Sequence, residues 1–327
     1  MANRIKEKYM AGKRYFDYPM LFLVIFLICF GLVMIYSTSS YKSTVTYGNS
    51  YHWLLRQAVA IVLGAVAMVV CCKLDYRIIK SEKFGNGCYW ASIVLLVLVL
   101  IIGAAKKGAV RWISIAGFQF QPSEVSKILV VIYLANRLSA NAHKIRTFKD
   151  SIVIVLPTVP IIALIVTQNL STALVVCSMI GVMLFVVSPK MKELMLTAGG
   201  GIILLFVYLL TANSYRNERV QIWLHPESHK KGFQTMQALY AIGSGGIFGK
   251  GLGQSMQKMG FIPESHNDMI FSIICEELGL FGAVCLILVF VTLIFRMLLI
   301  ALNTEDLFGS LIVIGFMTHI AIQVFIN

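Results

Sequence analysis

Asp268 is the strongest catalytic candidate in the chain because of where its carboxylate lies. It follows the polar loop 212–267 and precedes the apolar segment 271–299. A carboxylate at a membrane edge, after a loop that carries lysines, arginines and glycines, is well placed to accept a proton as a general base. The alternative is a helix N-cap, since free amide groups and the helix dipole favour an aspartate in a first turn.

Two polar loops, 104–121 and 212–267, supply cations that could bind an anionic partner. Their basic residues are Lys106, Lys107, Arg111, Arg216, Arg219, Lys230, Lys231, Lys250 and Lys258. Arg111 is suited to bind a phosphate group through two parallel hydrogen bonds. For Lys230 and Lys231, a solvated surface is an equally good interpretation.

Glu124 and Lys127 form a second candidate pair. Pro122 fits the first turn of a helix, so these two residues share one helix face inside the membrane boundary. A buried ion pair in a membrane is costly and usually faces a cavity, which favours a functional role. The alternative is that the pair holds two helices together.

The glycine-rich segment 243–253 allows two interpretations. Glycines let backbone amides approach a phosphate, and Lys250 would add a positive charge. A tight turn is the alternative. The spacing of the residues is not that of a nucleotide-binding P-loop.

Glu276 and Glu277 lie inside the apolar segment that follows Asp268. They are roughly 12 to 14 Å from it along a helix axis, which is too far for a paired acid–base site. At least one of them is expected to pair with a cation or with a glutamine such as Gln323. A proton or ion pathway is the alternative.

The elements that must position these residues are membrane helices. The chain has 327 residues, of which 58% are hydrophobic and 13% charged, and its mean hydropathy is +0.81. One water-soluble core could not hide so many apolar residues. We therefore predict an all-α, polytopic membrane helix bundle with nine spans: 20–36, 54–72, 88–103, 122–138, 152–167, 170–187, 194–211, 271–299 and 307–325.

The distribution of charge predicts the orientation of these spans. Basic residues crowd the first 18 positions and the segments after the second and fourth spans, which indicates a cytoplasmic N-terminus. The loops 104–121 and 212–267 then lie outside, the second as a large extracellular loop between spans seven and eight. Because the net charge of +13 is split among short loops, it does not indicate nucleic-acid binding. The seven cysteines lie in or beside apolar spans and indicate neither disulfides nor a metal cluster.

We divide the chain into a basic cytoplasmic tail, residues 1–18, and a single transmembrane domain, residues 19–327. A ninth span would bring Asn327 to the outer face, with no polar tail after it. We therefore expect a truncated chain that lacks at least one further helix.

Several motifs occur together in an order that resembles one family. They are Arg111-Trp112-Ile113, Phe120-Gln121-Pro122-Ser123-Glu124 with Lys127, Gly245-Gly246 with Gly249-Lys250-Gly251, Pro263-Glu264-Ser265-His266-Asn267-Asp268, and Glu276-Glu277-Leu278-Gly279. Over nearly the whole chain this combination resembles the SEDS family of FtsW, RodA and SpoVE cell-wall proteins, and segment 254–263 is more similar to FtsW or SpoVE than to RodA. The sequence departs from the family at Asn169, where an acidic residue is usual, and at Asn267 and Met269, where threonine and phenylalanine are commoner.

The resemblance implies a ten-helix peptidoglycan glycosyltransferase that polymerises lipid II at the outer face of the bacterial plasma membrane, in cell division or cell-shape maintenance. Asp268 falls on the catalytic aspartate of the family. The expected substrate-binding residues are Arg111, Lys107, Glu124, Lys127, Arg216, Arg219, Lys250 and His266. Expected partners are lipid II, a class B penicillin-binding protein transpeptidase, and membrane proteins of the divisome or elongasome.

The expected reaction is attack by the 4-hydroxyl of one lipid-linked disaccharide on the anomeric carbon of another chain, with inversion and with polyprenyl pyrophosphate leaving. Asp268 would be the general base, while cations or a divalent ion such as Mg²⁺ or Mn²⁺ would stabilise the leaving group. Asp268 could instead bind that ion, and no cofactor is certain. The alternatives are a lipid II flippase and a scaffold that recruits the transpeptidase.

Overall fold

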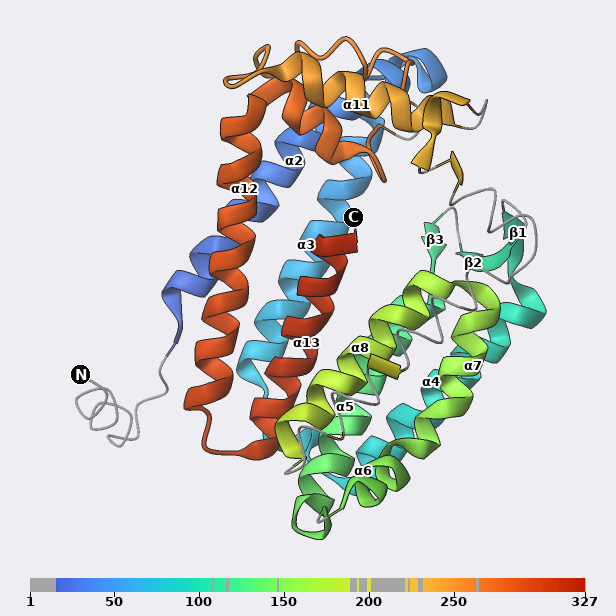
Figure 1. Ribbon diagram of the computed structural model, residues 1–327, viewed down its shortest axis with the longest axis vertical. Helices are drawn as coiled ribbons and strands as arrows, with labels where there is room; N and C mark the ends of the chain where they lie inside the picture. Colours follow the sequence, from blue (N-terminus) through green and yellow to red (C-terminus); the bar gives the residue numbers. More distant parts are fainter. Residues whose placement is uncertain are drawn as a thin grey trace. The chain divides into compact units, whose positions relative to one another are not determined.

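The computed structural model describes residues 16–106, 109–115, 118–145, 147–188, 193, 199–200, 221–222, 224–228, 232–262 and 265–326 (Figure 1). The elements are α2 (Tyr18–Tyr47), α3 (His52–Lys73), η1 (Tyr76–Ile79), α4 (Glu82–Ile102), β1 (Ala104–Lys106), β2 (Ala109–Ile115), β3 (Phe118–Phe120), α5 (Pro122–Asn141), η2 (Ala142–Lys144), α6 (Phe148–Val155), η3 (Leu156–Thr158), α7 (Val159–Gln168), α8 (Leu170–Val187), η4 (Pro226–Ser228), α11 (Phe233–Gly245), α12 (Ile270–Asn303) and α13 (Leu307–Ile326). The chain forms two compact units, residues 1–62 with 237–296 and residues 63–236 with 297–327.

Among the described residues, seven helical segments are long and apolar enough to cross a membrane. The predicted multi-pass helical membrane protein is therefore confirmed. The predicted span 122–138 forms α5 but is not one of the seven. Apart from residues 199–200, the predicted span 194–211 lies outside the described residues. The count of nine spans and their orientation remain predictions.

The first unit contains α2, the first half of α3, α11, the loop 246–269 and most of α12. Asp17 joins the two long helices: it accepts a hydrogen bond from the Met20 N–H at 2.9 Å, capping α2, and forms an ion pair with Arg296 of α12 at 2.6 Å. Near the other end of α2, a small apolar cluster packs α11 against the loop and the start of α12. Its members are Ala241, Ile262 and Ile273, with Met269 against them.

In the second unit, α5 is the central helix. It packs against α4, α8 and α13, and Val130, Val131 and Leu134 along it are fully buried. Because α5 is enclosed by other helices, it also buries polar side chains such as Asn136, whose amide donates to the Ile79 carbonyl oxygen at 2.9 Å. This enclosure explains why α5 is less apolar than the helices around it.

A three-stranded antiparallel sheet between α4 and α5 was not predicted. The strand order is β1-β2-β3, with Ala105 opposite Val110 and Ile113 opposite Phe120. We expected segment 104–121 to be a polar loop. Its cations and aromatic residues obscure the alternation of polar and apolar side chains that would indicate a short strand. The sheet is the one departure from an all-α fold in the described part of the chain.

Candidate active site

Asp268 lies in a turn directly before α12, and its side chain is exposed. Within the described residues, its carboxylate makes no hydrogen bond and no ion pair. The turn is closed by backbone groups instead, with the Ile270 N–H donating to the Asn267 carbonyl oxygen at 3.3 Å. Among the described residues, the side chain of Asp268 therefore does not cap α12, and its carboxylate is exposed.

The helix that follows Asp268 is broken at Gly279, whose φ of 68° and ψ of −171° are not helical. The glycine-rich loop inserts at this break and replaces helical hydrogen bonds. Four backbone bonds of 2.9 to 3.0 Å join the loop to the helix: Lys250 N–H to Glu276, Gly251 N–H to Glu277, Leu280 N–H to Gly246 and Phe281 N–H to Ile247. The amides of Lys250 and Gly251 are thus bound to α12, which favours the interpretation of this segment as a tight turn.

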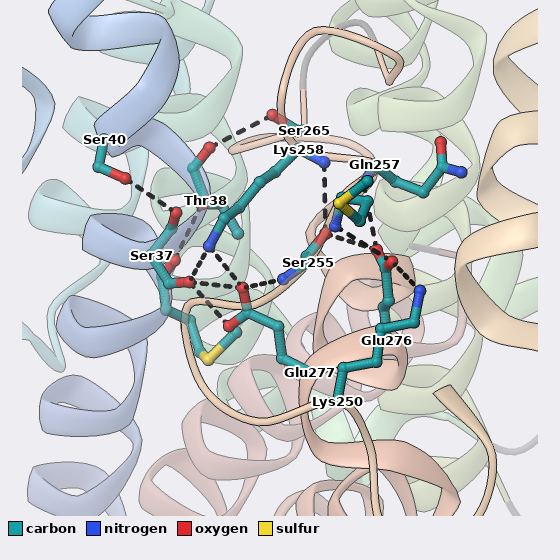
Figure 2. Close-up of polar contacts among 12 residues, drawn as sticks. Ser37, Thr38, Ser40, Lys250, Ser255, Gln257, Lys258, Ser265, Glu276 and Glu277 are labelled. Atoms are coloured by element: carbon teal, nitrogen blue, oxygen red, sulfur yellow. Dashed lines mark hydrogen bonds and ion pairs between the residues drawn. The ribbon is translucent and has the colours of Figure 1, made fainter. Parts of the chain in front are cut away.

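Glu276 and Glu277 of α12 are both fully buried, with 0% of each residue exposed. Lys250 Nζ lies 2.7 Å from Glu276 Oε1, and Lys258 Nζ lies 2.8 Å from Glu277 Oε1 (Figure 2). The predicted pairing with a cation is confirmed. Because each carboxylate has its own ammonium partner, the group as a whole is neutral, which favours a structural role over an ion pathway.

Glu124 and Lys127 form the predicted ion pair in the first turns of α5, which begins at Pro122. Lys127 Nζ lies 2.8 Å from Glu124 Oε2, and the two side chains are 2% and 47% exposed. The cation is therefore buried and the carboxylate is open. His319 of α13 interacts electrostatically with both residues, and its Nδ1 is buried without a hydrogen-bond partner in the described part of the chain.

Arg111 is half-buried on β2 and is held by the turn between α7 and α8. Its Nε donates to the Gln168 carbonyl oxygen at 2.6 Å, and Gln168 Nε2 donates to the Leu96 carbonyl oxygen at 3.3 Å. The next residue, Asn169, caps α8 by accepting from the Ser171 N–H at 3.0 Å. Asparagine is among the residues favoured at this position, because its side-chain oxygen accepts from a free amide of the first turn.

His266 lies in the same turn as Asp268 and beside an aromatic ring from the start of α3. Its ring centroid is 5.0 Å from that of Trp53. The Arg56 guanidinium lies 5.7 Å from the same indole ring, a cation–π contact. Trp53 thus contacts both His266 and Arg56.

The first unit also contains a cavity of about 560 Å³ between α2 and the segment 252–259. Ser37 and Lys258 line it together with apolar residues such as Tyr36, Leu252 and Met259. Asp268 does not line this cavity. The cavity instead adjoins the buried ion pair of Lys258 and Glu277.

Comparison with known proteins decides which family this arrangement belongs to. The model of the FtsW, RodA and SpoVE family, described as cell cycle proteins, matches residues 18–327. The chain belongs to this family. A probable peptidoglycan glycosyltransferase FtsW from Geobacter metallireducens is 35% identical over 322 residues, covering 95% of this chain and 84% of the relative. The stage V sporulation protein E of Bacillus subtilis is 35% identical over 321 residues, covering 95% and 86%.

Solved structures of this FtsW, RodA and SpoVE type share the fold. A chain of a peptidoglycan synthase complex that coordinates polymerization and crosslinking matches with a TM-score of 0.77 at 28% identity, covering 95% of this chain and 86% of that chain. The rod shape determining protein RodA of Thermus thermophilus matches with a TM-score of 0.68 at 27% identity, covering 95% and 84%. The predicted family and membrane fold are confirmed.

The residues predicted for the active site of this family member fall in two groups. Asp268, Lys250 and His266 belong to the first unit, and Arg111, Glu124 and Lys127 belong to the second. Lys107, Arg216 and Arg219, which were also predicted to bind substrate, lie outside the described residues. No group of three His, Cys, Asp or Glu in the described part of the chain could hold a metal ion, so a divalent ion at Asp268 would need ligands from elsewhere.

The contacts of Lys258, Ser37, Ser255 and His319 were not predicted from the sequence. The pairing of Lys258 could have been inferred from the sequence. Two adjacent glutamates inside an apolar helix require two cations, and the preceding loop contains Lys250 and Lys258. The contacts of the two serines and the histidine could not be inferred in this way, since they depend on how elements distant in the sequence pack.

Proposed function

We propose that this protein is a peptidoglycan glycosyltransferase that polymerises lipid II into glycan strands at the outer face of the bacterial plasma membrane. Its membership of the FtsW, RodA and SpoVE family and the names of its relatives support this activity. The observation that carries the proposal is Asp268, an exposed carboxylate without a partner in the described structure, in a turn that leads directly into a membrane helix.

Asp268 acts as the general base. Its carboxylate takes the proton from the 4-hydroxyl of one lipid-linked disaccharide while that oxygen bonds to the anomeric carbon of the other chain. The bond from that carbon to the polyprenyl pyrophosphate breaks, and the pyrophosphate leaves with the electron pair. Direct displacement inverts the configuration of the anomeric carbon.

Arg111 and Lys127 are two cations of the second unit that are suited to phosphate groups of the lipid-linked substrate. The guanidinium of Arg111 has the planar donor geometry that matches phosphate oxygens, and its Nε is held by the Gln168 carbonyl oxygen. The buried ammonium of Lys127 is only weakly screened by water, which strengthens its attraction to negative charge. Lys250, in the first unit, forms the ion pair with Glu276, so we assign it a positioning role and no contact with substrate.

The partner of this enzyme is a class B penicillin-binding protein transpeptidase, together with membrane proteins of the divisome or elongasome. The similarity to a chain of a peptidoglycan synthase complex supports this proposal. Crosslinking consumes the glycan strands that polymerisation supplies, so the two activities are suited to one assembly.

The test is polymerisation of purified lipid II by the protein in detergent with its candidate transpeptidase, alongside a flipping assay in lipid II vesicles. We expect glycan ladders whose length grows with time. Flipping without polymerisation would replace the proposal with a flippase. Transpeptidase binding without either activity would replace it with a scaffold.

A further inference from the structure

Two carboxylates buried side by side join the loop that leads to Asp268 to two helices of the first unit. We propose that they form a clamp that positions the Asp268 turn for glycosyl transfer, an inference that rests on the proposed function. The clamp consists of Glu276, Glu277, Lys250, Lys258, Ser255 and Ser37. None of its members touches substrate in this account, so they are positioning residues.

Glu276 holds the middle of the loop. Besides the ion pair with Lys250, its carboxylate accepts hydrogen bonds from Ser255 Oγ at 2.5 Å, from the Met256 N–H at 3.2 Å and from the Gln257 N–H at 3.4 Å (Figure 2). Three consecutive residues of the loop therefore bind one buried group. This arrangement fixes the backbone of residues 255–257 against α12.

Glu277 extends the clamp to α2. Successive residues of a helix point about 100° apart, so its carboxylate faces another direction than that of Glu276. Ser37 Oγ of α2 lies 2.7 Å from each of its oxygens, and Lys258 Nζ lies 3.1 Å from the same hydroxyl (Figure 2). One buried carboxylate thus joins α2, the loop and α12.

The clamp is continuous with the turn that carries Asp268. After Lys258, the chain is held by the Ile262 N–H, which donates to the Gln257 carbonyl oxygen at 3.0 Å, and by the packing of Ile262 in the apolar cluster. Ser265 Oγ then donates to the carbonyl oxygen of Thr38, the residue after Ser37, at 3.4 Å. Asp268 has no partner of its own in the described structure, so its position depends on this backbone.

A positioning role is expected from the energetics of buried ion pairs. Desolvation offsets most of the attraction, so replacing both partners by uncharged groups of similar size often leaves stability unchanged. Removing one partner is different, because it leaves a buried charge uncompensated. A displacement of about 1 Å at a reacting group can lower the rate by about a hundredfold. Loss of the clamp should therefore reduce kcat more than substrate affinity or stability.

The test replaces both charges of one pair, as Glu277→Gln with Lys258→Met. The matched control removes the ion pair of the second unit, Lys80→Met with Asp306→Asn, whose charges lie 2.5 Å apart. In lipid II polymerisation we expect kcat of the clamp variant to fall at least about tenfold, with KM and melting temperature near those of the wild type. The control should keep its kcat. An unchanged kcat in the clamp variant, or a kcat that falls only together with the melting temperature, would overturn the proposal.

A second variant tests the proposal if the double variant misfolds, and a second measurement tests it if the wild type is inactive. Ser37→Ala removes the bridging hydroxyl without changing charge, and we expect kcat to fall several-fold with the melting temperature preserved. Hydrogen exchange of residues 259–262 and 265–269 should become faster in both clamp variants and stay unchanged in the control, because the clamp holds these residues. Unchanged hydrogen exchange in the clamp variants overturns the clamp proposal even if the wild type forms no glycan. If exchange is faster in the clamp variants but the wild type forms no glycan, the result contradicts the proposed function alone.

Discussion

Gly279 at the break in α12 is a position where a single methyl group should destabilise the protein strongly. Its φ of 68° and ψ of −171° lie in a region that is almost restricted to glycine, and a side chain there costs about 1 to 3 kcal/mol in backbone strain. A Cβ would also overlap the backbone nitrogen of Gly249 and the carbonyl oxygen of Ile247. Overpacking of this kind costs about 1 to 3 kcal/mol more. We therefore expect Gly279→Ala to destabilise the protein by about 2 to 6 kcal/mol.

The assay is thermal unfolding of the purified protein in detergent, with Gly181→Ala in α8 as the matched control. A Cβ at Gly181 meets no atom within 4 Å, and alanine in a helix interior is favoured over glycine by about 1 kcal/mol. The control should therefore melt at or slightly above the temperature of the wild type. Gly279→Ala should melt at least about 3 °C below it. Equal melting temperatures of the two variants would refute the account of the helix break.

Three further predictions concern the second unit. Asn169→Ala should cost about 0.5 to 2 kcal/mol because α8 loses its cap, and an unchanged melting temperature would contradict this. Burial raises the pKa of Asp306, but the hydrogen bond from Lys80 and those from backbone amides outweigh it and hold the pKa below its usual value. The ionised Asp306 carboxylate therefore stabilises the fold above the unfolded pKa of about 3.9. This stabilisation is lost as the pH falls through the lower, folded pKa, so the melting temperatures of the wild type and Asp306→Asn should converge in acid. Glu124→Gln should destabilise more than Lys127→Met, because it leaves a buried ammonium unpaired whereas the reverse change leaves an exposed carboxylate; the opposite order in unfolding would contradict the burial.

The helices were predictable from the sequence because long apolar runs must be helical in a membrane. The pair of Glu124 and Lys127 was predictable too, since Pro122 fixes where the helix begins and three-residue spacing brings the charges together. The break at Gly279 was not, because the apolar run continues through it and the four replacing hydrogen bonds come from a loop about 30 residues earlier.

Within the candidate site, the type of residue was easier to predict than its partner. Asp268 was identified because its carboxylate lies between a membrane span and a loop that carries lysines, arginines and glycines. Lys250 was assigned to phosphate, but its partner is Glu276, a contact between residues that are distant in the sequence. The sequence showed that the glutamates need cations, while only the packing of α2 against the loop shows that Ser37 completes their environment.

The most direct test of the central claim is the initial rate of lipid II polymerisation by Asp268→Asn, compared with the wild type and with Asp75→Asn. Asp75 is an exposed aspartate that accepts a hydrogen bond from the Arg77 N–H, so the control makes the same chemical change away from the site. A general base contributes about 10²- to 10⁴-fold to a rate. We predict at least about a hundredfold loss for Asp268→Asn, with the melting temperature and lipid II binding of the wild type, and no loss for Asp75→Asn. A folded Asp268→Asn variant that polymerises lipid II at the rate of the wild type would contradict the account.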